Sequence, residues 1–353
     1  MASTIAAITT SGGGVVTTAD ATGNLNLLAG TTTVVALTTA GAAVSGTLSA
    51  TLDATIYGVT VGLGGGAVST NTAVGASALV ANTTADENVA IGALAMTSTT
   101  TGNAQVAVGR SALRDNTTGS ENTAVGRTTL AGNTTGNLNS GMGRGALQNN
   151  TTGSSNTADG AFALFSNTTA SNNTAVGYQA GYTNTAAATT AFGSQALYSN
   201  TTGTQNTAVG RVALYSNTTG ANNIAMGLQA LYTNSTGSQN TAIGTDSLYS
   251  NTTASNNTAV GYQAGYSNTT GTRVSAFGYL AGYSQATTGY STFIGSYSGQ
   301  LTTGTNNTFI GDVAGQSVTT GASNTILGRF NGNSGGLDIR TASNYIVLSD
   351  GDG

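Results

Sequence analysis

The sequence predicts an all-β protein, a β-solenoid (β-roll) of 17-residue coils that assembles in parallel as a homotrimeric fibre. Three observations lead to this prediction: a regular internal repeat, an alternation of side chains within each repeat, and a composition almost without charge. Of the 353 residues, 6% are charged, against roughly 25% in an average soluble domain. The composition is therefore unlike that of an ordinary globular enzyme.

A glycine closes each repeat and defines the period. The motif NTAVG, as in residues 173–177, recurs so that successive anchor glycines are 17 residues apart in thirteen intervals and 16 apart in two. Because the length changes by one residue only, each unit must return the chain to the same place, as stacked coils do. The anchor glycines are Gly75, Gly92, Gly109, Gly126, Gly143, Gly160, Gly177, Gly193, Gly210, Gly227, Gly244, Gly261, Gly278, Gly295, Gly311 and Gly328.

The three residues before each anchor glycine predict a short strand. The first is Thr, Val, Ile or Ser, and the third is apolar in fifteen of sixteen repeats, Asp159 being the exception. These two share one face, while the middle residue, usually Ala, points to the other. Asn stands four places before the glycine in twelve repeats, which predicts a ladder of side-chain amides along the stack. The glycine itself indicates a corner with positive φ or a close backbone approach.

The rest of each repeat predicts a second strand and a turn. Segments such as 194–198 follow the anchor glycine and precede an Asn-Thr-Thr-Gly sequence or a close variant, which is typical of turns. Along the chain we expect a β-rich attachment region at 1–66, the repeat shaft at 67–328 and a capping segment at 329–353. Five short runs predict the strands of the first region: Gly14–Thr18, Leu25–Leu28, Thr33–Leu37, Val44–Leu48 and Ile56–Val61.

Energetic considerations favour an oligomer. Ordering one coil costs ~17 to 34 kcal/mol, whereas burying one Val and one Leu per coil returns ~3 to 6 kcal/mol. The row of alanines offers a surface for close contact between chains, so we expect a parallel homotrimer about a long axis. Fifteen intervals at the strand spacing give a rod on the order of 70 Å. Phe293, Phe309 and Ile326 replace the small residue near the end, where we expect the axial packing to change and to form a bulkier cap.

Missing residue types exclude most chemistry. The chain has no Lys, His or Cys, so Ser-His and Cys-His nucleophiles, Schiff bases and ordinary zinc sites are excluded. We expect no enzyme activity, no cofactor and no metal. A net charge of -4 with scattered arginines predicts no nucleic-acid partner. The sequence has no apolar run of ~18 residues and no basic n-region followed by an apolar leader. We therefore expect assembly in a cytoplasm, without insertion into a membrane.

The repeats resemble those of known fibrous proteins. NTAVG and N-x-AIG are similar to the head repeats of trimeric autotransporter adhesins, although the usual coil there is shorter and those adhesins need a signal peptide and a membrane anchor. The array resembles phage tail fibres more closely, with a similar following segment at 324–353 and a less similar preceding one at 14–33. Such fibres often continue into a cleaved C-terminal chaperone, and nothing in this chain resembles it.

The resemblance implies the shaft of a phage tail fibre, a virion component assembled in the host cytoplasm that supports attachment to the host cell. Its partners would be two further copies, other tail or baseplate proteins and a host surface polysaccharide. The alternative is a glycan-binding adhesin or extracellular filament at a cell surface. An ice-binding solenoid needs a flat Thr-x-Thr face, which adjacent threonines in the turns do not supply. A polysaccharide lyase or hydrolase needs clustered carboxylates, and the twelve acidic residues are scattered.

A column of tyrosines is the candidate site. Tyr198, Tyr215, Tyr232 and Tyr249 recur at one position, in a column that also holds Tyr182, Tyr266 and Tyr283. They either contact sugars of a host polysaccharide or pack along the outside of the coils.

Two further patterns have a functional and a structural interpretation. The Asn-Thr-Thr sequences match glycosylation acceptors but are also turn sequences. Asp350 and Asp352 supply two of the six to eight oxygens that calcium needs, or belong to an acidic chain end. Asp159 either faces water or meets Arg144 one coil away.

Overall fold

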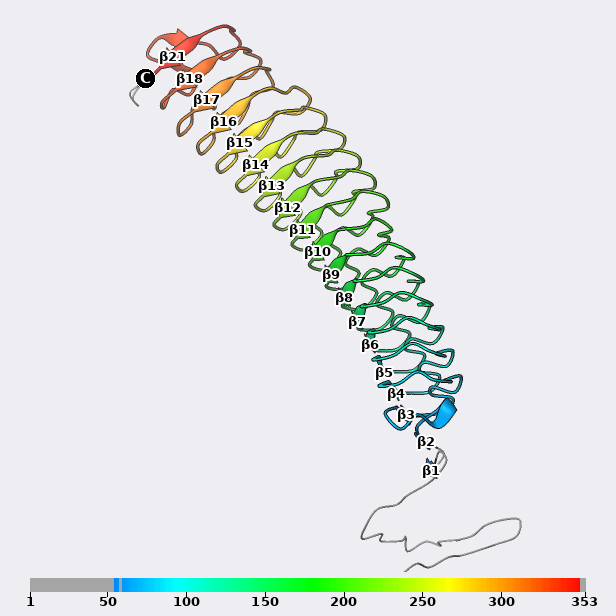
Figure 1. The fold of residues 1–353 in the computed structure, drawn as a ribbon. Coiled ribbons are helices and arrows are strands. Elements are labelled where there is room, and N and C mark those ends of the chain that lie inside the picture. Colours follow the sequence, from blue (N-terminus) through cyan, green and yellow to red (C-terminus); the bar gives the residue numbers. More distant parts are fainter. Residues whose placement is uncertain (1–53, 57–58, 350–353) are drawn as a thin grey trace, which may run out of the picture. The chain divides into compact units, whose positions relative to one another are not determined.

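The computed structural model describes residues 54–56 and 59–349. These residues form a parallel β-solenoid of about sixteen turns of roughly 17 residues, with almost no helix (Figure 1). The predicted strand runs between residues 14 and 48 lie outside the described residues, and the run at 56–61 falls on an antiparallel pair of strands.

One strand per coil builds the sheet. The strands are β1 (Ala54–Ile56), β2 (Val59–Gly62), β3 (Thr72–Val74), β4 (Val89–Ile91), β5 (Val106–Val108), β6 (Thr123–Val125), β7 (Ser140–Met142), β8 (Thr157–Asp159), β9 (Thr174–Val176), β10 (Thr190–Phe192), β11 (Thr207–Val209), β12 (Ile224–Met226), β13 (Thr241–Ile243), β14 (Thr258–Val260), β15 (Ser275–Phe277), β16 (Thr292–Ile294), β17 (Thr308–Ile310), β18 (Thr325–Leu327), β19 (Asn333–Ser334), β20 (Leu337–Asp338) and β21 (Ile346–Leu348). A short 3-10 turn, η1 (Gly65–Ala67), precedes β3.

The strands pair in register along the whole stack. From β3 to β18 each strand is parallel to the next, with Thr opposite Thr and Ala opposite Ala, as for β10 and β11. At the start β2 pairs antiparallel with β1 and β3. The repeat therefore builds one continuous sheet, as the spacing of the anchor glycines predicts.

The predicted second strand is wrong. The segment after each anchor glycine forms a chain of turns, because its second and fourth residues have left-handed backbones, as Gln195 (φ 57) and Leu197 (φ 51) show. Its backbone still bonds to the neighbouring coils: the N–H of Leu197 donates to the carbonyl of Ala213 at 3.0 Å. A coil thus contains one strand and a bonded turn segment.

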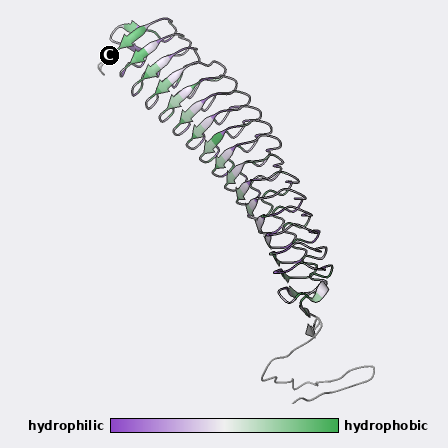
Figure 2. Cartoon of the chain, in the orientation of Figure 1, coloured by the Kyte–Doolittle hydropathy of each residue, from purple (hydrophilic) through white to green (hydrophobic). Residues whose placement is uncertain are grey.

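The alanine row lies in the core of its own chain, so the expected contact between chains through alanine is wrong. Ala208 and Ala225 are fully buried, while the strand residues on either side of them are half-buried or exposed. Figure 2 shows the row of strands as the more hydrophobic part of the coils. Leu214 and Leu231, each the fourth residue after an anchor glycine, are also fully buried in the same cluster. The third residue after the anchor glycine, such as Ala213, is fully buried there as well. The core of such a coil is therefore two Ala and one Leu, and the valines expected inside lie outside.

Near the C-terminal end, large and small residues exchange places in the core. Phe293 and Phe309 occupy the alanine position and are fully buried, with ring centroids 5.7 Å apart. The leucine position of these coils is glycine, and a Cβ at Gly299 or Gly315 would overlap a phenylalanine ring. These phenylalanines therefore change the packing within the chain, in place of the axial packing expected from the sequence.

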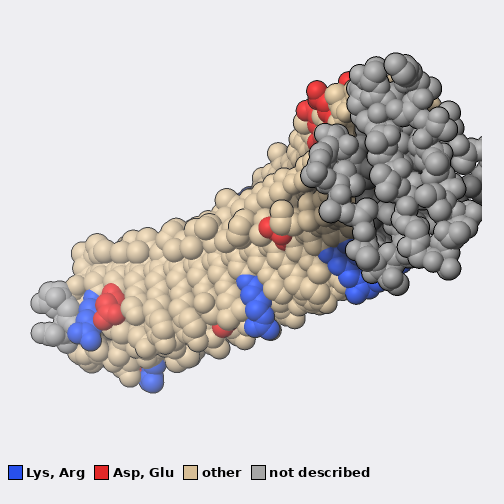
Figure 3. All heavy atoms as spheres, turned by 90° about the horizontal axis from the view of Figure 1, so that it is seen from below, with Lys and Arg blue, Asp and Glu red and all other residues tan. Residues whose placement is uncertain are grey.

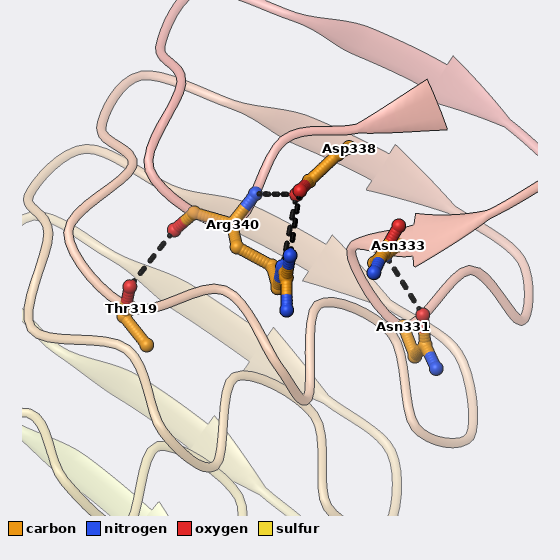
Figure 4. Close-up of polar contacts among 5 residues, drawn as sticks. All are labelled: Thr319, Asn331, Asn333, Asp338 and Arg340. Atoms are coloured by element: carbon orange, nitrogen blue, oxygen red, sulfur yellow. Dashed lines mark hydrogen bonds and ion pairs between the residues drawn. The ribbon is translucent and has the colours of Figure 1, made fainter. Parts of the chain in front are cut away.

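The segment after Gly328 adds one more rung to the sheet. β21 pairs parallel with β18, after a small hairpin of β19 and β20. Figure 4 shows its contacts: Thr319 Oγ1 donates to the carbonyl of Arg340 at 3.1 Å, and Arg340 Nη2 lies 2.7 Å from Asp338 Oδ2. Hydrogen bonds from the Arg340 side chain and backbone lower the pKa of Asp338 to about 2. In the preceding coil the hydroxyl of Thr303 donates to the carbonyl of Thr319 at 3.2 Å. The carbonyl of Arg340 accepts the equivalent hydrogen bond from Thr319.

Two amide ladders run through the interior. Asn122 Oδ1 accepts the backbone N–H of Asn139 at 3.0 Å, and Asn139 Nδ2 donates to the carbonyl of Gly153 at 2.8 Å. This ladder confirms the prediction from the Asn four places before the anchor glycine. The buried amides of Asn122 and Asn139 are therefore satisfied by the neighbouring coils, whereas Asn173 Nδ2 and Asn257 Nδ2 are buried without a hydrogen-bond partner.

Candidate functional site

The tyrosine column forms a continuous stack of rings. From Phe165 to Tyr283, consecutive ring centroids are 5.1–5.3 Å apart and the rings are tilted by 3–12°. Each ring comes from the fifth residue after an anchor glycine, so the spacing of the rings is the spacing of the coils. The stack contains all four predicted contact residues, Tyr198, Tyr215, Tyr232 and Tyr249.

Stacking limits how this column can bind a sugar. Aromatic residues usually hold sugars against the flat face of the ring, and here each of the four predicted rings has a neighbour on both faces. The ring edges and hydroxyl groups remain for polar contacts with a ligand. Packing along the outside accounts for the geometry, and glycan contact stays a prediction.

Sequence reasoning missed a second, shorter aromatic ladder. Tyr262 and Tyr279 directly follow their anchor glycines and stack with centroids 5.4 Å apart, and Tyr279 meets Tyr297 edge-on. The motifs YQAGY at 262–266 and YLAGY at 279–283 carry both ladders. Two tyrosines four residues apart in one motif were the signal for it.

The stack raises the pKa of tyrosines within it. Burial raises the pKa of Tyr198 above its ordinary value of 10.0, and Tyr215 and Tyr182 raise it further. Burial also raises the pKa of Tyr266, with Tyr249 and Tyr283 adding to the effect. The folded state therefore holds these two protons more tightly than the unfolded state does.

We expect the protein to lose stability as the pH rises above 10. Below the unfolded-state pKa of about 10, both tyrosines are protonated and their contribution to stability is complete. As the pH rises through the raised pKa values of the folded state, this contribution is lost, because the unfolded chain releases the protons more readily. Melting temperatures measured from pH 8 to pH 11.5 should fall in the native protein. The fall in melting temperature should be smaller in a Tyr198→Phe, Tyr266→Phe double variant. In a Tyr345→Phe control, whose ring lies outside the stack, the fall should be the same as in the native protein. Equal falls in all three proteins would contradict the assignment.

The asparagines of the Asn-Thr-Thr sequences form the second interior ladder. Asn217 is fully buried, and its Nδ2 donates to Asn200 Oδ1 at 2.7 Å and to the carbonyl of Gly220 at 2.9 Å. Its Oδ1 accepts from Asn234 Nδ2 at 2.8 Å. Since a glycan acceptor must expose this nitrogen, the folded geometry favours the turn interpretation over glycosylation.

Replacing one of these asparagines should destabilise the stack. Asn217→Ala removes three hydrogen bonds, each contributing about 0.5–1.5 kcal/mol, and leaves Asn200 Oδ1 buried without a partner, which costs about 1–3 kcal/mol more. The Gly220 carbonyl and Asn234 Nδ2 each keep one other partner, Asn206 Nδ2 and the Gly237 carbonyl. We expect the free energy of unfolding in urea to fall by about 3 kcal/mol or more. Thr219→Ala, at an exposed position two residues away, is the matched control and should change it by less than about 0.5 kcal/mol. A similar loss in both variants would contradict the role of the ladder.

Charged groups are few, and Figure 3 shows them as isolated patches on an uncharged surface. Within residues 54–56 and 59–349 no group of three His, Cys, Asp or Glu residues could hold a metal ion. Asp350 and Asp352 lie outside this part of the chain. Arg144 lies over the ring of Phe162, 5.1 Å from its centroid, and the ion pairs of the described residues do not join it to Asp159.

Comparison of the chain with protein-family models, with curated proteins and with solved structures found no match. Among the residues that the structure describes, no helix has the length and apolar character needed to cross a membrane. The fold and its surfaces are therefore the basis for a functional proposal.

Proposed function

We propose that this chain is the shaft of a phage tail fibre, a homotrimeric virion appendage that supports attachment to the host cell. The observation that carries the proposal is the unbroken stack from β3 to β18, in which every strand pairs in register with the next. A chain that repeats one coil without interruption makes a rod on the order of 70 Å long at the strand spacing. The resemblance of the NTAVG array and of residues 324–353 to tail fibres points the same way.

The proposed mechanism is mechanical. Each coil is bonded to its neighbours through the sheet, the turn segment and two amide ladders, so that bending at one coil must break several bonds together. Such a rod holds a tip at a fixed distance from the particle. One end of the rod would join other tail or baseplate proteins. A surface polysaccharide of the host would bind at the other end of the rod, or to a protein attached there.

The first test is the native mass and form of the purified protein. Light scattering on a sizing column should give three times the chain mass of 34.4 kDa, and negative-stain electron micrographs should show rods of uniform length. A monomer would overturn the trimeric shaft and return single-chain solenoids, including the ice-binding one, to consideration.

A second test separates the virion from the cell surface. Antibodies against residues 67–328, applied to virus particles and to cells in immunogold electron microscopy, should label tail fibres. Label on cells with none on particles would favour the alternative, an adhesin or extracellular filament. In that case a glycan array with the native protein and a Tyr215→Leu variant would test the tyrosine column as its binding surface.

A further inference from the structure

The outward side of the sheet is a strip of two columns, one apolar except for Asp159 and the other mostly threonine. We define the outer strip as the first and third residues of strands β3 to β18, which flank the buried middle residue. The third residues include large apolar side chains whose exposed fractions run from 36% to 52%: Ile91, Met142, Phe192, Met226, Ile243, Phe277, Ile294, Ile310 and Leu327. Contiguous exposed apolar surface of this extent usually marks an interaction site.

The strip is large enough for a stable interface. Sixteen rungs at ~4.8 Å and three residues at ~3.3 Å give a surface roughly 70 Å long and 10 Å wide, or about 700 Å². A standard protein interface buries about 800 Å² on each partner. Since neighbouring strands already pair within the sheet, the partner would contact side chains of the strip.

Opposite charges stand at the two ends of the strands. Both glutamates of the chain, Glu87 and Glu121, lie two residues before a strand, β4 and β6. Five of the eight arginines directly follow an anchor glycine, and therefore lie two residues after a strand: Arg110, Arg127, Arg144, Arg211 and Arg329. The N-terminal half of the strip thus has an acidic edge and a basic edge, and both glutamates and these arginines are exposed.

Most of these charges have no ion-pair partner among residues 54–56 and 59–349. In the described residues the ion pairs are Arg114 with Asp115, Arg329 with Asp312 and Arg340 with Asp338. Glu121 and Arg127 flank the same strand, β6, and six residue steps at ~3.3 Å put them up to roughly 20 Å apart. The extended strand between them places them at opposite edges of the strip, and they form no ion pair within the chain. Glu121 of one copy can instead meet Arg127 of another.

We propose that the outer strip is the self-association surface, on which a second copy of the chain lies parallel and in register, with the glutamate edge of one copy against the arginine edge of the next. Glu121 would then lie level with Arg127, with Arg110 and Arg144 one rung to either side. This proposal rests on the homotrimer of the proposed function and names its interface.

The distribution of charge decides the direction of packing. In an antiparallel pair aligned end to end, β6 would face β15, whose flanking positions hold Arg273 and Tyr279, so Glu121 would have one arginine opposite it. Glu87, beside β4, would face β17, whose flanking positions hold Asn306 and Asp312. In parallel packing both glutamates have an arginine level with them or one rung away, which favours the parallel direction. Contact between unlike edges is also head-to-tail, and a head-to-tail contact related by a 120° rotation closes into a ring of three identical copies. The parallel trimer places both the apolar strip and the charges against complementary groups.

The lack of native cysteine makes disulfide trapping a direct test. In a Glu121→Cys, Arg127→Cys variant, the two positions are too far apart in one chain for a disulfide, which needs Cα atoms within about 7 Å. After mild oxidation of the purified assembly, a non-reducing denaturing gel should show covalent dimers and trimers. The matched control is Glu121→Cys, Arg211→Cys, which uses the same two edges but strands five rungs apart, and should show no cross-linked species.

Light scattering on the same samples separates the inference from the proposed function. A trimer that forms no disulfide in the Glu121→Cys, Arg127→Cys variant and that also tolerates charge reversal at Glu121 and Arg127 would overturn this interface and leave the trimeric shaft standing. Cross-linking in the Glu121→Cys, Arg211→Cys control would overturn the proposed register between copies. A disulfide-linked dimer in a single Glu121→Cys variant would show two glutamate edges in contact and would overturn the head-to-tail arrangement. A monomer in the native protein would overturn both proposals.

Charge reversal tests the same contact without new bonds. Glu121→Arg and Arg127→Glu alone should each promote dissociation, seen as at least a tenfold rise in the protein concentration at which half the chains are trimeric. The double variant should recover most of this loss. Single and double variants that dissociate alike would overturn the pairing of these two residues.

Discussion

Gly227→Ala should disrupt the stack in the middle of the rod. Gly227 has φ +139°, and a Cβ there would lie 2.5 Å from the carbonyl oxygen and 2.6 Å from the carbonyl carbon of Gly244 on the next coil. Both obstacles are backbone atoms, so the two coils must move apart and lose their ladder bonds. We expect the free energy of unfolding to fall by about 4 kcal/mol or more, which places the change among the largest single-residue effects.

The damage should be local as well as large. In a repeat protein each coil contacts only its neighbours, so opening between Gly227 and Gly244 should expose nearby backbone first. Limited trypsin digestion should then cleave faster after Arg211 in the variant than in the native protein, and more so than after Arg144. Gly336→Ala is the control, because Gly336 also has a positive φ, +84°, but a Cβ there meets nothing within 4 Å. Equal destabilisation by the two substitutions would show that backbone strain, and not the close approach of coils, is what requires glycine.

The period and the amide ladder could be predicted because each follows from one column of the repeat. A constant spacing of anchor glycines fixes the rise of one rung per coil, and Asn139 has the same neighbours as Asn122 one coil away. Translational symmetry therefore turns a sequence pattern directly into a contact between coils. The single strand per coil is harder to predict, since Gln195 and Leu197 have left-handed backbones although their residue types also suit strands. The mark of this backbone is in other coils, where the position of Leu197 is a glycine with φ 58–61°: Gly181, Gly265, Gly282, Gly299 and Gly315.

The direction of the faces could not be predicted either. Alternation separates Ala208 from Thr207 and Val209 but does not say which side is inside. Hydrophobicity favours Val inside, yet the coil is so narrow that Ala208 and Leu214 fill it. The larger Val209 is left partly exposed. The apolar residues that an isolated chain would bury are thus placed on the outer strip, which is why we propose the interface on these side chains and not on the alanines.

Phe293→Ala should create a cavity that a second substitution can fill. Phe293 is fully buried, and truncating a buried phenylalanine costs about 3–5 kcal/mol. Gly299→Leu alone should be at least as harmful, because its side chain would overlap the ring of Phe293. Together the two changes recreate the residue pair found in earlier coils. There an alanine in the strand packs in the core with a leucine after the anchor glycine, as Ala208 and Leu214 do. We expect the double variant to recover most of the stability that either single variant loses.

A double-mutant cycle measured by urea unfolding quantifies this compensation. Gly299 has φ +58°, and Leu214 has φ +50° at the equivalent position, so the backbone there already suits leucine. The coupling free energy should therefore be favourable and at least about 2 kcal/mol, within the range for residues in contact. Val318→Ala, a fully buried residue of the same end of the rod, is the control and should add to Gly299→Leu without recovery. If Phe293→Ala and Gly299→Leu were simply additive, the volume of each coil would not be shared between strand and turn segment, and the glycines of the last coils would need another explanation.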